Sequence, residues 1–254
     1  MKLNLTLFVF CVLFLAVTSC SKDDDPVAQN ELSSAELSFE VGEDPVVIPT
    51  GLAQSDDPMA QSAVAYLTQA NEMSDFISKM QPPAGATKSS TAINSKVNSG
   101  GRTEGDVLVY TWTDGNYIYA YQISETDTKY VFELFWKFSD TSDFVRYILA
   151  EETKIKSGST LDGFLEVYSL FGESEDYQLR YQWDEDTDGT FRFDLLMQNN
   201  AFKINIVSNT DNSGSVKYFI SGSIFYDISW NTDGSGSWII YDDEGNISDS
   251  GTWS

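Results

Sequence analysis

One short acidic stretch has the spacing that suits a bound metal ion. Residues 184–189 read Asp-Glu-Asp-Thr-Asp-Gly, with a carboxylate on every second residue before a glycine. Calcium loops open in this way, because alternate residues direct their oxygens at one centre and the glycine permits a sharp turn. A complete twelve-residue calcium loop also ends in a glutamate, where this chain has Leu195. Two interpretations therefore stay open: a calcium site formed by Asp184, Asp186 and Asp188, or an acidic hairpin turn.

Cys20 is the second residue with distinctive chemistry. It follows Lys2 and a nearly continuous apolar run over residues 3–16, which has the charge and length of a secretory signal peptide and is too short to span a bilayer. The small residues 17–19 before Cys20 resemble the lipobox of bacterial lipoproteins. That resemblance implies a signal peptide over residues 1–19, cleavage after Ser19, and acylation of Cys20 by chains such as palmitate.

The residues after Cys20 indicate the cellular location of the protein. Residues 21–25 read Ser-Lys-Asp-Asp-Asp, which resembles the export signal of Bacteroidota surface lipoproteins. The resemblance implies a lipid anchor in the outer membrane with the protein facing the cell exterior; attachment facing the periplasm is the alternative. Each acyl CH₂ that is buried contributes about 0.8 kcal/mol, so several chains bind the membrane essentially permanently.

Composition excludes several classes of function. The formal net charge is −24, which disfavours binding to nucleic acid or to anionic lipid headgroups. Histidine is absent, and the only cysteines are Cys11 and Cys20, so the mature domain has no disulfide and no His-dependent nucleophile or zinc site. We therefore expect a protein that is not an enzyme, with no cofactor apart from the candidate calcium ion.

A single amphipathic helix is predicted over residues 58–80. Asp57 is a favourable N-cap and Pro58 suits the first helical turn. Apolar side chains then recur at spacings of three and four; they are Met59, Ala63, Val64, Tyr66, Leu67, Ala70, Met73, Phe76, Ile77 and Met80. This apolar stripe is expected either to pack on a sheet or to form one wall of an apolar ligand cavity.

Two polar segments flank this helix. Residues 20–56 contain scattered prolines and are predicted to form a lipidated tether, although residues 37–41 and 46–48 could each add an edge strand. Residues 84–105 are rich in Gly, Ser, Thr and Asn and are predicted to be a linker. The helix, the linker and the residues from 106 to 254 then form one domain over residues 57–254.

From residue 106 onward the chain predicts a series of β-strands. Aromatic and β-branched runs alternate with short turn-forming segments, which indicates antiparallel neighbours joined as a meander. The expected strands are 107–112, 117–123, 130–138, 163–170, 177–183, 190–198, 201–207, 215–220, 223–230, 237–241 and a last one near 252. Residues 140–159 are ambiguous between helix and strand, and we favour a strand there.

Three tryptophans share a local pattern. Trp112, Trp183 and Trp230 each stand at a strand end before a Thr-Asp-Gly sequence. The Asp-Gly pair suits the positive φ of a tight turn, so this pattern indicates one hairpin design used repeatedly, with the aromatic ring capping the sheet edge. Alternatively, the tryptophans form a row on which a carbohydrate stacks.

The predicted fold is mainly β, with one N-terminal amphipathic helix and about ten antiparallel strands that curve into an open half-barrel or a closed barrel. This outline is similar to the lipoprotein carriers of the LolA and LolB families and, more distantly, to lipocalins, in architecture alone. Two functions are compatible with it. The first is a surface lipoprotein whose β domain binds a ligand, apolar if helix and sheet enclose a cavity. The second is a recognition or structural module that contacts glycan or protein through aromatic hairpins.

Overall fold

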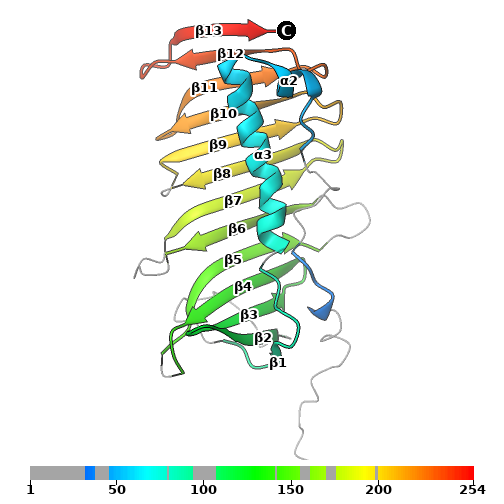
Figure 1. The fold of residues 1–254 in the computed structure, drawn as a ribbon, viewed down its shortest axis with the longest axis vertical. Coiled ribbons are helices and arrows are strands. Elements are labelled where there is room, and N and C mark those ends of the chain that lie inside the picture. The colour runs from blue at the N-terminus through cyan, green and yellow to red at the C-terminus, as the bar shows by residue number, and fades with distance from the viewer. Residues whose placement is uncertain are drawn as a thin grey trace, which may run out of the picture.

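The protein is a single open antiparallel sheet with a helix lying on one face (Figure 1). The computed structural model describes residues 32–37, 46–78, 80–93, 107–140, 142–154, 161–169, 176–197 and 200–254. The strands are β1 (Thr87–Ser89), β2 (Val107–Asp114), β3 (Tyr117–Glu125), β4 (Lys129–Lys137), β5 (Val145–Thr153), β6 (Asp162–Tyr168), β7 (Tyr177–Glu185), β8 (Phe191–Met197), β9 (Phe202–Ser208), β10 (Gly214–Ile220), β11 (Ser223–Trp230), β12 (Gly236–Tyr241) and β13 (Ile247–Trp253).

The topology is a meander throughout. The 13 strands lie in chain order, and each pairs with the next. Every strand predicted from residue 106 onward is confirmed, including β5 in the ambiguous segment. The closed-barrel alternative is wrong, since the first and last strands do not pair and the sheet is open.

β1 is a correction to the sequence prediction, because it lies within the segment expected to be a linker. Residues 87–89 pair with Val109, Tyr110 and Thr111 of β2. The strand is three exposed polar residues long, so it has no apolar alternation to reveal it. Only the open edge of β2, which tertiary structure creates, specifies this pairing.

The predicted helix is confirmed as α3 (Pro58–Ser78). The Asp57 carboxylate accepts hydrogen bonds from the backbone N–H groups of Met59 at 2.8 Å and Ala60 at 3.1 Å, as an N-cap should. The fully or nearly fully buried stripe consists of Ala60, Ala63, Leu67, Ala70, Met73 and Ile77. These residues belong to one core cluster with the side chains of the sheet, so the stripe is a packing face.

Part of the segment expected to be a tether also packs into this core. Leu32, Val46 and Leu52 are fully buried, and residues 50–54 form the short helix α2 (Thr50–Gln54). Residues 46–48 are not the strand that the sequence suggested as one option. Instead, the Asn71 side chain of α3 accepts from the Val46 N–H at 3.2 Å and donates to its C=O at 2.9 Å, which satisfies the backbone without a partner strand. The other optional edge strand spans residues 37–41; Leu37 is buried and not part of a strand, and residues 38–41 lie outside the described residues.

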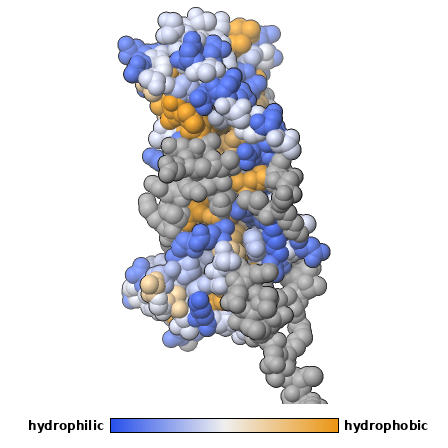
Figure 2. All heavy atoms as spheres, turned by 90° about the vertical axis from the view of Figure 1, so that its right-hand side faces the viewer, coloured by the Kyte–Doolittle hydropathy of each residue, from blue (hydrophilic) through white to orange (hydrophobic). Residues whose placement is uncertain are grey.

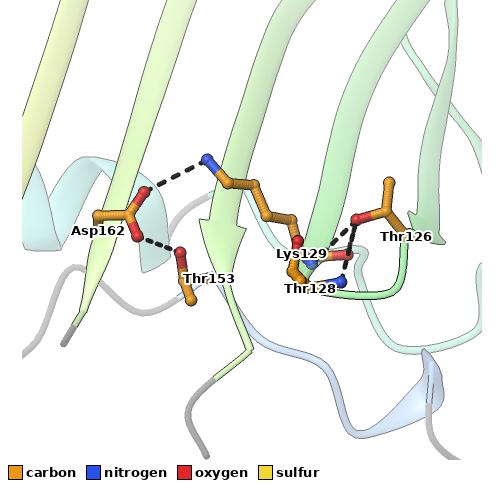
Figure 3. A network of polar contacts seen from close by, with 5 residues as sticks. All are labelled: Thr126, Thr128, Lys129, Thr153 and Asp162. Carbon is orange, nitrogen blue, oxygen red and sulfur yellow. Dashed lines mark hydrogen bonds and ion pairs between the residues drawn. The ribbon is translucent and has the colours of Figure 1, made fainter. Parts of the chain in front are cut away.

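The sheet face opposite α3 is held by cross-strand ion pairs. They alternate along the strands with core residues, as the two-residue strand period requires. The pairs are Glu133–Arg146 at 3.5 Å, Glu166–Arg180 at 2.6 Å, Asp194–Lys203 at 2.8 Å and Asp227–Lys217 at 3.1 Å. A further ion pair joins Lys129 of β4, across β5, to Asp162 of β6 at 3.3 Å. The Thr153 hydroxyl of β5 donates to the same carboxylate (Figure 3).

The turns form two rows along the long sides of the sheet. On the side at the right in Figure 1, turns 186–190, 209–213 and 231–235 share one design, which we call the Asp-turn row. In each, the first N–H donates to the last C=O at 2.8–2.9 Å, and the middle aspartate accepts the N–H two residues on at 2.9–3.0 Å. Figure 2 faces this side, where hydrophilic residues prevail and hydrophobic ones form separate patches. The other side carries turns 115–116, 138–144, 221–222 and 242–246, which we call the opposite turn row.

Tryptophan rings packed over glycines join neighbouring strands. A Cβ added at Gly163, Gly214 or Gly251 would lie 2.5–2.6 Å from the ring of Trp183, Trp230 or Trp238, respectively, and one at Gly236 would overlap Trp253. In addition, the Trp230 Nε1–H donates to the Asn212 C=O at 3.0 Å and the Trp253 Nε1–H to the Gly234 C=O at 2.6 Å. The Trp230 and Trp253 rings therefore each cover a glycine and also anchor a turn.

This packing makes Gly236→Ala a test of the fold. The added methyl group would overlap both the Trp253 ring and the Ser229 backbone oxygen, so strand or ring must shift. We expect a loss of about 1–3 kcal/mol in the free energy of unfolding, measured by urea denaturation. Thr252→Ala, at an exposed position on the neighbouring strand, is the control and should change stability little. An unchanged midpoint for Gly236→Ala would contradict the packing role.

Candidate functional site

An aromatic group gathers at the end of β2, β3 and β4 that belongs to the opposite turn row. It consists of Trp112, Tyr117, Tyr119, Trp136 and Phe138, and we call it the hairpin aromatic group. Trp112 stacks on Tyr119 with ring centroids 5.5 Å apart, and Tyr117 meets Trp136 at 5.5 Å and Phe138 at 5.7 Å edge-on. Tyr117 and Phe138 are exposed, so the group reaches from the core into solvent.

Strand register produces this gathering. Tyr119 is opposite Trp112 on β2 and opposite Trp136 on β4, so three rings share one face of three adjacent strands. The sequence predicted that Tyr117, Tyr119 and Tyr121 share a face, and this is confirmed for two of them, since Tyr121 belongs to the core cluster and Tyr119 packs against it. The register between the strands decides which aromatic residues of β2 and β4 lie beside them.

An open pocket of about 470 Å³ adjoins Trp112. Its walls are residues 83–87, residues 111–113 and Ile118. Residue pairing between β1 and β2 stops at Thr87 and Thr111. The residues before β1 lie away from β2. They form a turn in which Gly85 has a φ of +91° and the Ala86 N–H donates to the Pro83 C=O. The pocket is the space that this separation opens.

The pocket offers aromatic and hydroxyl groups without charge. Trp112 is the aromatic residue of the lining, and Thr111, Thr113 and Thr87 carry hydroxyl groups that can donate and accept hydrogen bonds. None of its lining residues is titratable, so the pocket itself contains no general acid or base. Next to it, burial is the main cause that raises the pKa of Tyr119, with the Asp114 charge adding to it, so this phenol is neutral at physiological pH. The arrangement suits an uncharged ligand that presents both apolar faces and hydroxyl groups.

The buried carboxylates lie elsewhere and are engaged in structure. Glu133 accepts from the Gln122 side chain at 2.7 Å and pairs with Arg146. Glu166 pairs with Arg180 and accepts from the Tyr168 hydroxyl at 2.5 Å. Burial, followed by the bond to Glu166, raises the pKa of Tyr168 well above the usual range of tyrosine. A phenol held in its protonated form is a poor nucleophile, so this network acts as a cross-strand brace.

The acidic stretch has the geometry of a hairpin turn. Asp184 and Asp186 both pair with Arg192, at 3.5 and 2.5 Å, and Asp188 accepts the Thr190 N–H at 2.9 Å. Burial raises the pKa of Asp184, whereas hydrogen bonds from Thr190 lower that of Asp188. Over the described ranges no group of three or more acidic, His or Cys side chains is placed to hold a metal ion. The three candidate residues are thus not gathered around one centre.

The predicted tryptophan row is wrong for two of its three members. Trp183 is 1% exposed and Trp230 is 3% exposed, and both belong to the core cluster that α3 shares with the sheet. They do not cap the sheet edge either, because they pack over glycines of the neighbouring strand. Only Trp112 is partly exposed, and it lines the pocket. The pocket loop at residues 83–87 gave no signal in the sequence beyond its turn-forming Pro and Gly.

The proposed lipidation site, Cys20, and the acidic residues after it lie outside the described residues. Among the helices that the structure does describe, none is long and apolar enough to cross a membrane. No protein-family model matches the chain, and a search of curated proteins returns no match. Its function is therefore inferred from its residues and their geometry.

The Asp-turn row makes stability depend on pH. Hydrogen bonds from Thr190, Ser213 and Ser235 hold the pKa values of Asp188, Asp211 and Asp233 below the usual value. A lowered folded-state pKa stabilises the fold above the unfolded value of about 3.9, and this contribution is lost as pH falls through the folded pKa. Replacing all three by Asn keeps an acceptor, so the melting temperature should fall less steeply from about pH 5 to about pH 3 than in the wild type.

The matched control replaces the exposed residues Asp56, Asp127 and Asp243 by Asn. It removes the same charge without touching these turns and should keep the steep dependence of the wild type. If the melting temperatures of the two triple variants depend equally steeply on pH, the three turn aspartates contribute no more to the pH dependence than other exposed aspartates do.

Proposed function

We propose that this chain is a non-enzymatic lipoprotein, acylated at Cys20 and held in the outer membrane with its β domain facing the cell exterior, and that the domain recognises a neutral glycan. Support for the anchor comes from the apolar run, the lipobox-like residues 17–19 and the acidic residues 23–25. The absence of His from the whole sequence and the lack of titratable groups in the pocket lining support a binding role.

The observation that carries the glycan proposal is the position of Trp112. Trp112 is one of the residues that line an open pocket, and three threonines also belong to its lining. Sugars combine apolar C–H faces with hydroxyl groups, so an aromatic ring beside uncharged donors and acceptors matches both. The exposed rings of Tyr117 and Phe138 extend this surface beyond the pocket, which suits a chain of several sugar units.

An apolar ligand between α3 and the sheet has less support. The helix stripe is buried against sheet side chains, with Ala60, Ala63 and Leu67 fully inaccessible. The same core cluster contains large side chains of the sheet, such as Trp183 and Phe193, which occupy space that a ligand would need. We therefore prefer recognition at the periphery of the sheet.

Binding to oligosaccharides tests the glycan proposal. The soluble domain without residues 1–20 is titrated calorimetrically with maltohexaose, cellohexaose, xylohexaose and mannohexaose, and we expect at least one to bind. Trp112→Ala should weaken that binding about tenfold, since one aromatic contact contributes about 1–1.5 kcal/mol. Phe225→Ala, which removes an exposed ring far from the pocket, should leave the affinity unchanged. Binding to none of the four sugars, or equal affinity for wild type and Trp112→Ala, would refute it.

Fractionation of cells tests the anchor. In a Bacteroidota host, Cys20→Ala should move the protein from the membrane fraction to the soluble periplasmic fraction, because the acyl chains supply the membrane affinity. Cys11→Ala, within the apolar run, should leave the protein membrane-bound. Protease added to intact cells should degrade the wild-type domain if it faces the exterior. Retention of Cys20→Ala in the membrane would exclude acylation at this residue.

A further inference from the structure

A row of apolar side chains crosses five strands beside α3. The strand register places its members directly opposite one another: Val167 of β6 with Leu179 of β7, Leu179 with Met197 of β8, Met197 with Phe202 of β9, and Phe202 with Ile220 of β10. We call these five residues the apolar row. Since neighbouring strands lie about 4.8 Å apart, the apolar row is roughly 19 Å long.

The apolar row lies on the face of the sheet that α3 covers, but to one side of the helix. Val167, Leu179 and Met197 pack against the core cluster that α3 shares with the sheet. Each member stands within two residues of a strand end on the side of the opposite turn row, where the strands extend beyond α3 at the left in Figure 1. All five side chains keep part of their surface exposed, and Ile220 is 38% exposed. The helix therefore leaves this strip of the apolar face open.

Aromatic contacts connect the apolar row to the flank of α3. The Tyr218 ring lies 6.4 Å from that of Phe202, 6.2 Å from that of Phe225 and 5.2 Å from that of Tyr226, between ring centroids. The Tyr226 hydroxyl then donates to the hydroxyl of Tyr66 on α3 at 2.5 Å. The open strip thus has a floor of strand side chains and, at its β11 end, a wall formed by the helix.

Charged side chains do not interrupt the apolar row. Those next to it in sequence, Glu166, Arg180 and Lys203, point to the other face by the two-residue period of the strands. There they are engaged in ion pairs, Glu166 with Arg180 and Lys203 with Asp194. Isolated exposed apolar residues need no explanation, but a continuous row of them does.

An amphipathic helix is the occupant that fits this strip. A small apolar molecule is normally enclosed on most sides, whereas a helix buries one stripe and keeps its other side in water. The same face of the sheet already packs the apolar stripe of α3 in this way, with Ala63, Leu67 and Ala70 fully buried. At a rise of 1.5 Å per residue, about 13 helical residues cover the roughly 19 Å of the apolar row.

We infer that the apolar row is a docking site for an amphipathic helix of another protein, which lies beside α3 with Lys or Arg on its solvent-facing side. The formal charge of −24 favours a basic partner and repels both anionic lipid and a second copy of this chain. In the described part of the chain, moreover, α2 and α3 already pack on their own sheet, so a second copy has no helix to offer from there. The docking site is separate from the Trp112 pocket and does not depend on the glycan proposal.

A defined peptide tests the docking site. A fluorescent fourteen-residue peptide, Leu-Lys-Lys-Leu-Leu-Lys-Leu repeated twice, is titrated into the soluble domain, and anisotropy is recorded. Met197→Ser, Phe202→Ser and Ile220→Ser combined should weaken binding about tenfold, which corresponds to about 1.4 kcal/mol. The control variant, Val47→Ser, Val145→Ser and Ile247→Ser combined, should bind like the wild type. Absence of binding to the wild type, or equal affinity of the two variants, overturns the proposal.

A pair of single variants keeps the test valid if the triple variant is unstable in thermal melts. Ile220→Lys places a like charge in the path of the basic peptide and should weaken binding at least threefold. Ile247→Lys makes the same change of net charge at a residue that is 62% exposed and pairs with Tyr241 at the far end of the sheet, so its affinity should equal that of the wild type. Equal affinities of the two single variants contradict a site at the apolar row.

A change in the peptide tests the helical form of the occupant. Proline at its two central positions breaks a helix but leaves an extended segment possible, so this peptide should bind at least tenfold more weakly. A peptide with the same composition, rearranged so that leucines are spread around the helix, should also bind weakly. Affinities equal to that of the original peptide would show that no helix is recognised.

Crosslinking in cells of the native host identifies the occupant. A photoreactive amino acid at Ile220 should capture a peptide of another protein whose apolar residues recur at spacings of three and four, and one at Ile247 should not. Mass spectrometry reads the captured sequence. A captured segment without that spacing, a crosslink to lipid or to a second copy of this chain, or no crosslink at Ile220 overturns the proposal.

Discussion

The stacking of tryptophan rings on cross-strand glycines is the contact on which the rest of the structure depends. Gly214 under Trp230 and Gly236 under Trp253 let an indole lie flat against the neighbouring backbone. The same rings bind turn carbonyls, and the turn at Gly234 lies against α2. The Trp238 Nε1–H also reaches the Asp57 carboxylate that caps α3, at 3.4 Å. The glycine positions thus connect the sheet, its turns and the start of the helix.

This arrangement leaves the two faces of the sheet with different roles. The face under α3 is apolar and filled. The other face is crossed by ion pairs such as Glu166–Arg180 and Asp194–Lys203, which use most of the Lys and Arg residues of the strands. Because the chain has 39 acidic residues against 15 basic ones, the acids left over lie at turns and edges. The turns and edges of the sheet are therefore acidic, and they are also the places where the domain can still contact a ligand or partner.

The candidate recognition surface arises where the regular sheet stops. The pocket beside Trp112 exists because the chain before β1 leaves the edge of β2. It needs no change in the sheet itself. A meander can vary its turns and its terminal strands while the cross-strand packing that stabilises it stays constant.

The sequence by itself determined the elements. Asp57 and Pro58 specified the start of α3, and short turns between aromatic runs specified an antiparallel meander, because both signals are local in the chain. Tertiary structure decided what depends on contacts between distant residues. Arg192 reaches Asp184 and Asp186, which turns a calcium-like spacing into an ion-paired turn, and Trp183 lies in the core because Gly163 is opposite it. Register also brought Trp112, Tyr119 and Trp136 together, and the accumulated geometry of 13 strands left the sheet open. Local periodicity carries no information about register between strands or about closure, since both depend on the twist and pairing of the whole sheet.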